Sequence, residues 1–535
     1  MTAMQAFEEA PPVSPPDAEP SPAQASRLRD RLAPPMPPAS VWGWAGPLLV
    51  TLFGGFLRFY RLSIPHAVIF DETYYVPDAY GILRRGVEMN AIDSGANRTV
   101  VDRLLAHGST HILTNTGEYV AHPPLGKVVI AVGEWLFGLS PFGWRFAVAV
   151  AGTAAILMTA RITRRMTRST LLGCIAGLLM ALDGLELVLS RTALLDILVM
   201  FWVLAAFGML VIDRDVTRAR LADAAEAEDS DLGGGGPKLG IRWRRVLAGI
   251  FLGCACATKW DGIWYILGFG GLAIAWDLGA RRAAGYGDRI YGTLRSDVKW
   301  LPVSFGLAPV AAYLASWSGW FASSVGYGRN WAAQNGNHTP IWSALDSLYQ
   351  YNRSMLAFGL GLNSHQGYVS NPWTWLILGR PVSFFYASPK GCPGGCSQEV
   401  LAIGTPAIWW TANLALLFCI GWWIARRDWR AGAVLLGVGA GWLPWFWFAW
   451  HDQRTEFYFY SVAFLPFLVI AITLCLGLII GPVRAAPGRR AAGAIIAGAF
   501  LILVLANFAY LYPILTAKVI PYSFWHQRMW FSSWI

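Results

Sequence analysis

Two adjacent carboxylates, Asp71 and Glu72, lie in the stretch IFDETYYVPDAYGILRRG, soon after a long apolar run. Aromatic residues surround them in the sequence: Phe70, Tyr74, Tyr75 and Tyr80. A carboxylate that aromatic side chains shield from water has a raised pKa, and it can act as a general base toward a hydroxyl group. The same acids can also cap a helix, because negative charge is favoured at a helix N-terminus. Neighbouring helical residues point about 100° apart, which suits the pair to two different roles rather than to one shared proton.

Cations elsewhere in the chain offer a way to hold a phosphate, which Arg and Lys bind through charge-assisted hydrogen bonds. An arginine at the end of a membrane span is costly unless it faces a polar cavity or a lipid head group. The candidates are His122 and Lys127 in HPPLGK, Arg145 in GWRF, Arg191 in LSRTALLD, Lys259 in ATKWDG, and His451 and Arg454 in HDQRTEF.

Each of these cations also has a simpler interpretation. Arg191 can pair with Asp196, Lys259 can pair with Asp261, and the long stem of Lys127 can reach the membrane interface. The HDQR turn is typical of a polar connection between two spans. Taken together, the acids, the cations and the many Tyr and Trp side chains, on which sugar rings stack, suggest glycosyl transfer from a lipid-phosphate sugar. Spacing alone does not establish this reaction.

The composition is that of a membrane protein. The chain has 535 residues, of which 55% are hydrophobic and 14% are charged, whereas soluble domains carry about 25% charged residues. The first explanation for its net charge of +10 is a set of positive cytoplasmic loops, and no soluble segment alternates basic and aromatic residues. We therefore expect no nucleic acid partner.

Apolar length predicts an all-α polytopic membrane protein with about 11 transmembrane helices. They are expected near residues 41–60, 143–160, 170–188, 194–212, 246–258, 262–280, 300–318, 405–425, 431–450, 457–480 and 493–513. Lys and Arg cluster in alternate gaps, so the positive-inside rule places the N-terminus in the cytoplasm and the C-terminus outside. The apolar stretch 122–138 is assigned to an interfacial or re-entrant helix at the outer surface, because a twelfth span would move a basic cluster outside.

Four segments follow from this topology. They are a disordered, Pro-rich cytoplasmic tail (1–40), an N-terminal membrane module (41–318) that includes a first outer loop (61–142), a second outer loop (319–404), and a C-terminal membrane module (405–535). The glycine-rich segment 222–238 is expected to be a flexible linker. Because the unusual polar residues gather on the outer side, we expect the chemistry at the extracytoplasmic face of the plasma membrane.

Cysteine usage agrees with this placement. Five of the seven cysteines lie in apolar spans, where they serve as small core residues. The other two, Cys392 and Cys396, form CPGGC in the second outer loop, and an oxidising compartment favours a disulfide between them over two free thiols. No second Cys or His pair is near, so a metal site is not expected there.

The chain resembles the bacterial, actinobacterial-type protein O-mannosyltransferases, which are multi-spanning C-type glycosyltransferases. DETYY, HPPLGK, LSRTALLD, ATKWDG, HDQRTEFYFYSVAFLP and the terminal RMWFSSWI carry the resemblance, which runs from about residue 45 to the end. DE followed by HPPLGK is its most specific part.

The resemblance implies a polyprenyl-phosphate-mannose donor presented outside and a Ser or Thr hydroxyl on an unfolded secretory protein as acceptor, with the secretion translocon as a further partner. It also implies inversion from a β-linked donor to an α-linked product. Asp71 would be the base, Glu72 would orient donor or acceptor, and Arg145 and Arg191 would shape the phosphate site. No cofactor is required, since the lipid phosphate is its own leaving group, and a divalent metal is left open.

One departure from the family concerns the second outer loop. Residues 319–404 number 86, too few for the β-trefoil domain of the eukaryotic members, so the basis of acceptor selection stays open. The alternative enzyme is a glycosyltransferase that uses the same kind of donor but acts on a glycolipid or a cell-wall glycan. A transporter would show inverted repeats and ionisable residues at mid-membrane, and a structural component would tolerate loss of the outer acids. Prenyl chain length, acceptor sequence rules and oligomeric state do not follow from the sequence.

Overall fold

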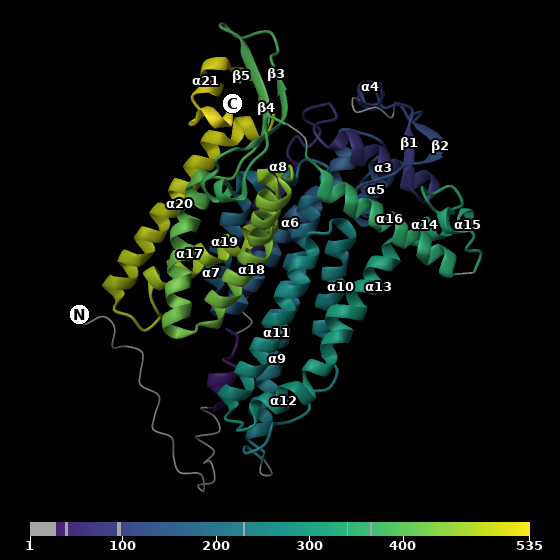
Figure 1. The fold of residues 1–535 in the computed structure, drawn as a ribbon. Helices are drawn as coiled ribbons and strands as arrows, with labels where there is room; N and C mark the ends of the chain where they lie inside the picture. The colour runs from purple at the N-terminus through teal and green to yellow at the C-terminus, as the bar shows by residue number, and fades with distance from the viewer. Residues whose placement is uncertain (1–27, 38–40, 94–97, 228–230, 340, 364–365) are drawn as a thin grey trace. The chain divides into compact units, whose positions relative to one another are not determined.

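The computed structural model describes residues 28–37, 41–93, 98–227, 231–339, 341–363 and 366–535, and it is mostly helical (Figure 1). The chain divides into two compact units, each described here by itself. The larger unit comprises Met36–Asp213, Ile241–Ala275 and Trp300–Ile535, and the smaller unit comprises Met1–Pro35, Arg214–Gly240 and Trp276–Lys299. This division follows packing, so the four segments predicted from topology stay a prediction.

Helices make up most of the larger unit. Those up to residue 284 are α2 (Trp42–Phe59), α3 (Glu72–Arg85), α4 (Thr99–Ala106), α5 (Leu125–Phe137), α6 (Pro141–Thr167), α7 (Thr170–Ala181), α8 (Gly184–Leu189), α9 (Asp196–Ala225), α10 (Trp243–Thr258) and α11 (Gly262–Ala284). Later ones are α13 (Ala308–Ser316), α14 (Ser318–Ala322), α15 (Trp331–Gln334), α16 (Trp342–Gly361), α17 (Pro406–Arg426), α18 (Trp429–Trp447), α19 (Leu465–Ile480), α20 (Pro487–Leu515) and α21 (Tyr522–His526). Helices α9 and α11 begin in the larger unit and end in the smaller one.

The predicted number of membrane spans is not confirmed. Among the described residues, eight helices are long and apolar enough to cross a membrane. Three of the expected eleven spans fall instead on α2, α7 and α10, which have 18, 12 and 16 residues. Helix α5, assigned to the interface from sequence, has 13 residues, which span about 20 Å, less than the ~30 Å of a hydrocarbon core.

The all-α prediction is wrong outside the long helices. Strands β1 (Met89–Ala91) and β2 (Leu113–Gly117) pair antiparallel, and β3 (Val382–Ala387), β4 (Cys396–Ala402) and β5 (Ile520–Pro521) form a second antiparallel sheet in the order β3-β4-β5. Figure 1 shows both sheets at the same end of the long helices of this unit as α3. A sheet with open edges is excluded from the hydrocarbon region but not from loops in water.

The β3–β4 turn has local causes. Strand β3 reads VSFFYA, which is rich in residues that favour strands. The turn that follows contains Gly391, Gly394 and Gly395 at positive φ, a conformation that costs glycine nothing. The predicted disulfide, Cys392–Cys396, lies in this turn with its Cα atoms 5.2 Å apart.

The smaller unit contains the predicted linker and most of the predicted tail. Residues 28–32 form a short helix, and Leu32 is buried against Leu221, Leu239 and Tyr286. The rest of the predicted tail, residues 1–27 and 38–40, lies outside the described residues. Part of the predicted linker 222–238 is also ordered, since α9 continues to Ala225 and Arg281 donates hydrogen bonds to the carbonyl oxygens of Gly235 and Pro237. Helix α12 (Arg289–Ser296) completes this unit.

Candidate active site

The start of α3 separates the two carboxylates that opened the sequence analysis. Asp71 is the N-cap residue of α3, but its side chain makes no capping hydrogen bond within the described residues. Glu72 is fully buried. The helix-cap interpretation therefore accounts for the position of Asp71 and leaves its carboxylate available for other contacts.

Glu72 connects several segments through hydrogen bonds to its carboxylate. Its Oε1 accepts hydrogen bonds from Arg145 Nε at 2.7 Å and from the Ala193 N–H at 3.0 Å. Its Oε2 accepts from Arg145 Nη2 at 2.8 Å and from the Ile69 N–H at 3.0 Å. These bonds connect α3, α6 and the segment before α9, so Glu72 fixes the beginning of α3.

One face of α3 lines a cavity of about 440 Å³. Asp71, Tyr74, Tyr75 and Asp78 all lie on it, as expected for residues spaced three, four and seven apart on a helix. This spacing was the signal that could have identified Asp78, which the sequence analysis missed. The other walls carry Arg98, Glu118, His122, Lys127, Lys259, Arg454 and Tyr460.

The electrostatics of this cavity favour neutral carboxyl groups. Burial raises the pKa of Asp71 to about 7, with Lys259 lowering it and Asp196 raising it. Burial also raises the pKa of Asp78 to about 8, although Lys127 opposes this. A carboxyl with a pKa near 7 is half ionised at neutral pH, which is the condition for an efficient general base.

The lysine in ATKWDG has a different partner from the one considered in the sequence analysis. Lys259 Nζ donates to Asp196 Oδ1 at 2.9 Å and lies 3.9 Å from the ring centroid of Tyr460. The two simpler pairings, Arg191 with Asp196 and Lys259 with Asp261, are therefore not formed here. Lys259 presents a charge to the cavity that Asp196 partly neutralises.

Arg145 and Arg191 do not line the cavity. Arg145 is fully buried and donates to Glu72 and to the carbonyl oxygens of Leu62, Pro65 and Ala67. The Arg191 guanidinium donates to four carbonyl oxygens at or just beyond the end of α2, those of Leu57, Arg58, Tyr60 and Arg61. A cation at a helix C-terminus satisfies carbonyl groups that have no helical partner. Both arginines therefore hold the segments next to the cavity in place and do not contact its interior.

His122 and Lys127 do line the cavity. Burial and the nearby cations Lys259, Lys127 and Arg454 hold the pKa of His122 well below its usual value, so its ring is neutral at pH 7. Lys127 Nζ donates to the His122 carbonyl at 3.0 Å and lies 2.7 Å from Glu88 Oε1. The Lys127 ammonium group is thus occupied by protein partners, and it stabilises the HPPLGK turn.

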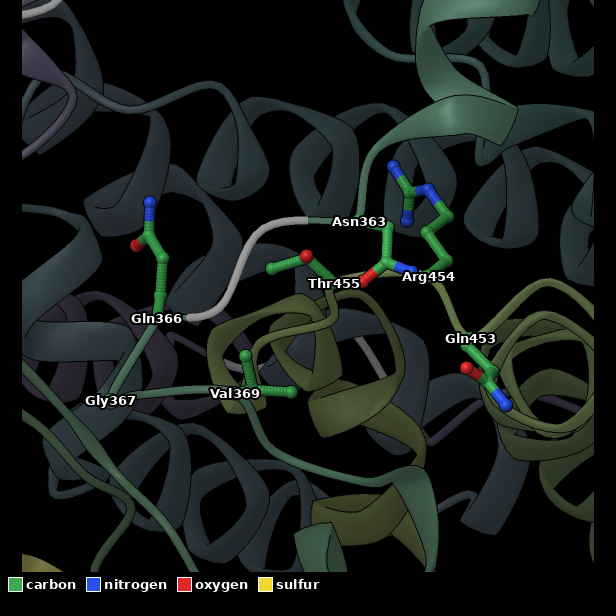
Figure 2. Close-up of a pocket in the computed structure, with 7 residues that line it drawn as sticks. All are labelled: Asn363, Gln366, Gly367, Val369, Gln453, Arg454 and Thr455. Atoms are coloured by element: carbon green, nitrogen blue, oxygen red, sulfur yellow. The ribbon is translucent and has the colours of Figure 1, made fainter.

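Two further cavities adjoin the first. An apolar one of about 620 Å³ lies among side chains of α10, α11, α13, α16 and α18, and it shares His122, Lys259 and Arg454 with the first. Figure 2 shows the third, of about 530 Å³, which is lined by Asn363, Gln366, Gly367, Val369, Gln453, Arg454 and Thr455. Arg454 lines all three cavities.

Arg454 has unused hydrogen-bonding capacity at this junction. Its Nε donates to the Gly359 carbonyl at 2.7 Å, and its guanidinium lies 5.3 Å from the Trp445 ring centroid. Its Nη1 is buried and has no hydrogen-bond partner among the described residues. A buried guanidinium nitrogen without a partner is costly, so this atom is suited to an anionic ligand.

Two models of known families match the chain. Residues 109–220 match the family "Dolichyl-phosphate-mannose-protein mannosyltransferase", and residues 344–534 match the "C-terminal four TMM region of protein-O-mannosyltransferase". The polyprenol-phosphate-mannose–protein mannosyltransferase of Mycobacterium tuberculosis is 39% identical over 92% of both chains. That of Corynebacterium glutamicum is 34% identical over 94% of this chain and 96% of its own. The chain belongs to the protein O-mannosyltransferase family.

The fold agrees with this membership. The structure resembles a chain of the Saccharomyces cerevisiae protein O-mannosyltransferase Pmt1–Pmt2 complex bound to the sugar donor, with a TM-score of 0.68 at 14% identity. The match covers 98% of this chain and 97% of the yeast chain. At this identity the likeness concerns the fold alone.

In this member of the O-mannosyltransferase family, the HDQRTEF turn contributes residues unequally. His451 is exposed, stacks edge-on against Trp447 and lies outside the three cavities, whereas Arg454 lines them. Glu456 was not among the residues predicted from the sequence. It is buried and lacks hydrogen-bond partners for either carboxylate oxygen within the described residues. Burial raises its pKa to about 8 despite the nearby Arg454.

Metal binding is not indicated by clustering. No group of three or more His, Cys, Asp or Glu side chains in the described part of this mannosyltransferase is arranged to hold a metal ion. The cavity wall contains cations that can hold a phosphate, including Lys259 and Arg454.

Proposed function

We propose that the chain moves mannose from polyprenyl-phosphate-mannose to Ser or Thr hydroxyls of secreted proteins, with Asp71 as the general base. The observation that carries this proposal is a carboxyl of raised pKa on the wall of a cavity that also holds Lys259 and Arg454. Family membership at 39% identity supports the donor and the reaction class.

The reaction is a single displacement at the anomeric carbon. The acceptor oxygen forms a bond to C1 of mannose while the bond from C1 to the phosphate oxygen breaks. The hydroxyl proton passes to the Asp71 carboxylate, and the electron pair of the broken bond leaves with the polyprenyl phosphate. One displacement inverts the anomeric configuration, as in inverting glycosidases, and requires no covalent sugar–enzyme intermediate. The donor carries its own leaving group, so the proposal includes no other cofactor.

The donor phosphate is assigned to the junction of the cavities. Arg454 offers a buried Nη1 without a partner, and Lys259 and His122 lie on the same walls. The apolar cavity of about 620 Å³ suits the prenyl chain. Glu72, Arg145, Arg191 and Lys127 are assigned to positioning, because their hydrogen bonds go to the protein itself.

The acceptor side is assigned to the cavity of Figure 2 and the adjoining wall of α3. Extracytoplasmic placement at the plasma membrane follows from the positive-inside argument. We assign the acceptor to an extended segment, whose hydroxyl enters the cavity beside Tyr74 and Gln366. This assignment agrees with delivery of the acceptor during secretion, with the translocon as a neighbour.

The test is a transfer assay with purified protein in detergent, radiolabelled polyprenyl-phosphate-mannose and a Thr/Ala/Pro-rich peptide. We expect label on the peptide with the wild type and with Asp452→Asn, an exposed acid that serves as the matched control. We expect none with Asp71→Asn. Label on a membrane glycolipid but not on peptide would instead support the glycolipid or cell-wall alternative.

A further inference from the structure

The residue immediately before Asp71 has an unusual backbone conformation. Phe70 lies at φ +48°, the left-handed region that costs free energy for any residue with a side chain. Such a conformation persists only where surrounding contacts enforce it, and it is found preferentially at functional sites. The contacts of the Phe70 ring therefore bear on the direction of the Asp71 carboxyl.

Three aromatic rings hold Phe70. Phe384 stacks on it, with ring centroids 4.4 Å apart and an interplanar angle of 14°. Phe459 and Phe457 meet it edge-on, at 5.6 Å and 6.4 Å. Phe384 and Phe459 also contact each other at 5.5 Å. Residues from two separate parts of the chain thus enclose the ring.

The strand that carries Phe384 is itself firmly held. Ser383 on β3 donates to Glu399 Oε1 on β4 at 2.8 Å, and Trp525 Nε1 of α21 donates to Glu399 Oε2 at 2.5 Å. Arg380, two residues before β3, donates to the carbonyl oxygens of Ser533 and Ile535. Phe384 therefore projects from a rigid platform that the second outer loop builds with the last residues of the chain.

We propose that Phe384 is a positioning residue, which acts through the Phe70 ring to hold the Asp71 carboxyl toward the acceptor hydroxyl. This inference rests on the proposed function, since it requires Asp71 to be the base. Phe384 lines none of the three cavities. Its effect must therefore appear in turnover and not in donor binding.

Phe384→Leu tests the proposal, because it keeps an apolar side chain but removes the stacked ring. Phe385→Leu is the matched control, since Phe385 is the next residue of β3 but is not among the rings that contact Phe70. We expect Phe384→Leu to lower kcat about tenfold or more, because small displacements of a catalytic group have large effects. We expect donor KM to change less than about twofold. Phe384→Tyr, which keeps the ring, should restore most of kcat, and Phe385→Leu should resemble the wild type.

The pH dependence separates positioning from simple loss of folded enzyme. The charged groups that act on Asp71 are Lys259 at the end of α10 and Asp196 at the start of α9. If Phe384→Leu lets Asp71 turn toward water, the acidic limb of the pH–rate profile moves to lower pH by about one unit or more. A smaller fraction of folded enzyme would lower the rate equally at every pH. An unmoved limb, a raised donor KM, or equal losses in the Leu and Tyr variants would overturn the proposal.

The outcome is distinguishable from failure of the proposed function. Absence of peptide labelling by the wild type would reject the function. Wild-type transfer with unchanged kcat in Phe384→Leu would reject only the positioning role.

Discussion

The first turn of α3 places two neighbouring carboxylates in opposite environments. Glu72 is buried and accepts four hydrogen bonds, two of them from Arg145. Asp71 faces a cavity and has a raised pKa of about 7. The two jobs therefore need two residues. Glu72 uses both carboxylate oxygens in hydrogen bonds that hold the start of α3, and this leaves the Asp71 carboxyl free to accept a proton. Mutations that affect one side and spare the other test this division.

Removal of the Asp71 charge should have the largest effect on activity. We expect Asp71→Asn to lower kcat about a thousandfold, because a positioned general base contributes about 10²- to 10⁴-fold. The raised pKa of Asp71 means that it favours the folded state below pH ~4 and loses this contribution as the pH rises through about 7. The variant should therefore show an equal or higher Tm at pH 8. A lower Tm in Asp71→Asn would mean that Asp71, like Glu72, stabilises the fold.

Loss of the buried ion pair should act on stability instead. We expect Glu72→Gln to destabilise the fold by about 3–5 kcal/mol, as for one partner of a buried pair removed alone. Thermal unfolding in detergent measures this, and Asp452→Asn again serves as the control. Protein that stays folded should keep more activity than Asp71→Asn. An unchanged Tm would mean that the four hydrogen bonds of Glu72 are dispensable.

The pH dependence of transfer should follow Asp71. Because the base must be ionised, we expect kcat/KM to fall about tenfold per pH unit below pH ~7, and to level off above it. The assay uses wild-type protein across pH 5 to 8 with a stability check at each point. A limb near the ordinary Asp pKa of about 4 would contradict the shielded environment of Asp71.

Arg454 should affect donor binding more than turnover. We expect Arg454→Gln to raise donor KM about tenfold, since one charge-assisted hydrogen bond to phosphate is lost. Arg353→Gln, an exposed arginine on α16, is the control. A pure loss of kcat with unchanged donor KM would move Arg454 away from the phosphate.

The disulfide should have the smallest effect. Cys392 and Cys396 close a short loop away from the cavities, so their replacement by Ser should cost ~2 kcal/mol or less. We expect near-normal transfer and a modestly lower Tm. Peptide mapping of membranes that found both thiols free would contradict the bond.

The sequence predicted which residues line the cavity better than it predicted their partners. The 100° offset between neighbours anticipated that Asp71 and Glu72 would diverge, and HPPLGK and ATKWDG both supplied cavity residues. Arg145 and Arg191 were assigned to phosphate. Arg145 instead pairs with Glu72, and both arginines donate to backbone carbonyl oxygens at the end of α2 or in the segment after it. No local pattern reveals such partners.

The sheets and the Phe70 contacts were missed for a related reason. Membrane spans were predicted from the length of apolar segments, and this criterion does not detect short strands. Strand β3 has only six residues, and the turn after it depends on three glycines at positive φ. The stacking of Phe70 on Phe384 joins two segments that are far apart in the chain and were both predicted to be outer loops. Contacts of this kind depend on the tertiary fold rather than on local propensity.

The aromatic enclosure of Phe70 also sets an order of events during biosynthesis. Its members come from residue 70 near the start of the membrane region and from residues 384, 457 and 459 in the later part of the chain. A nascent chain that ends before residue 459 lacks part of the aromatic contacts of Phe70. If Asp71 is the base, as we propose, we expect the chain to gain activity only when its synthesis is nearly finished.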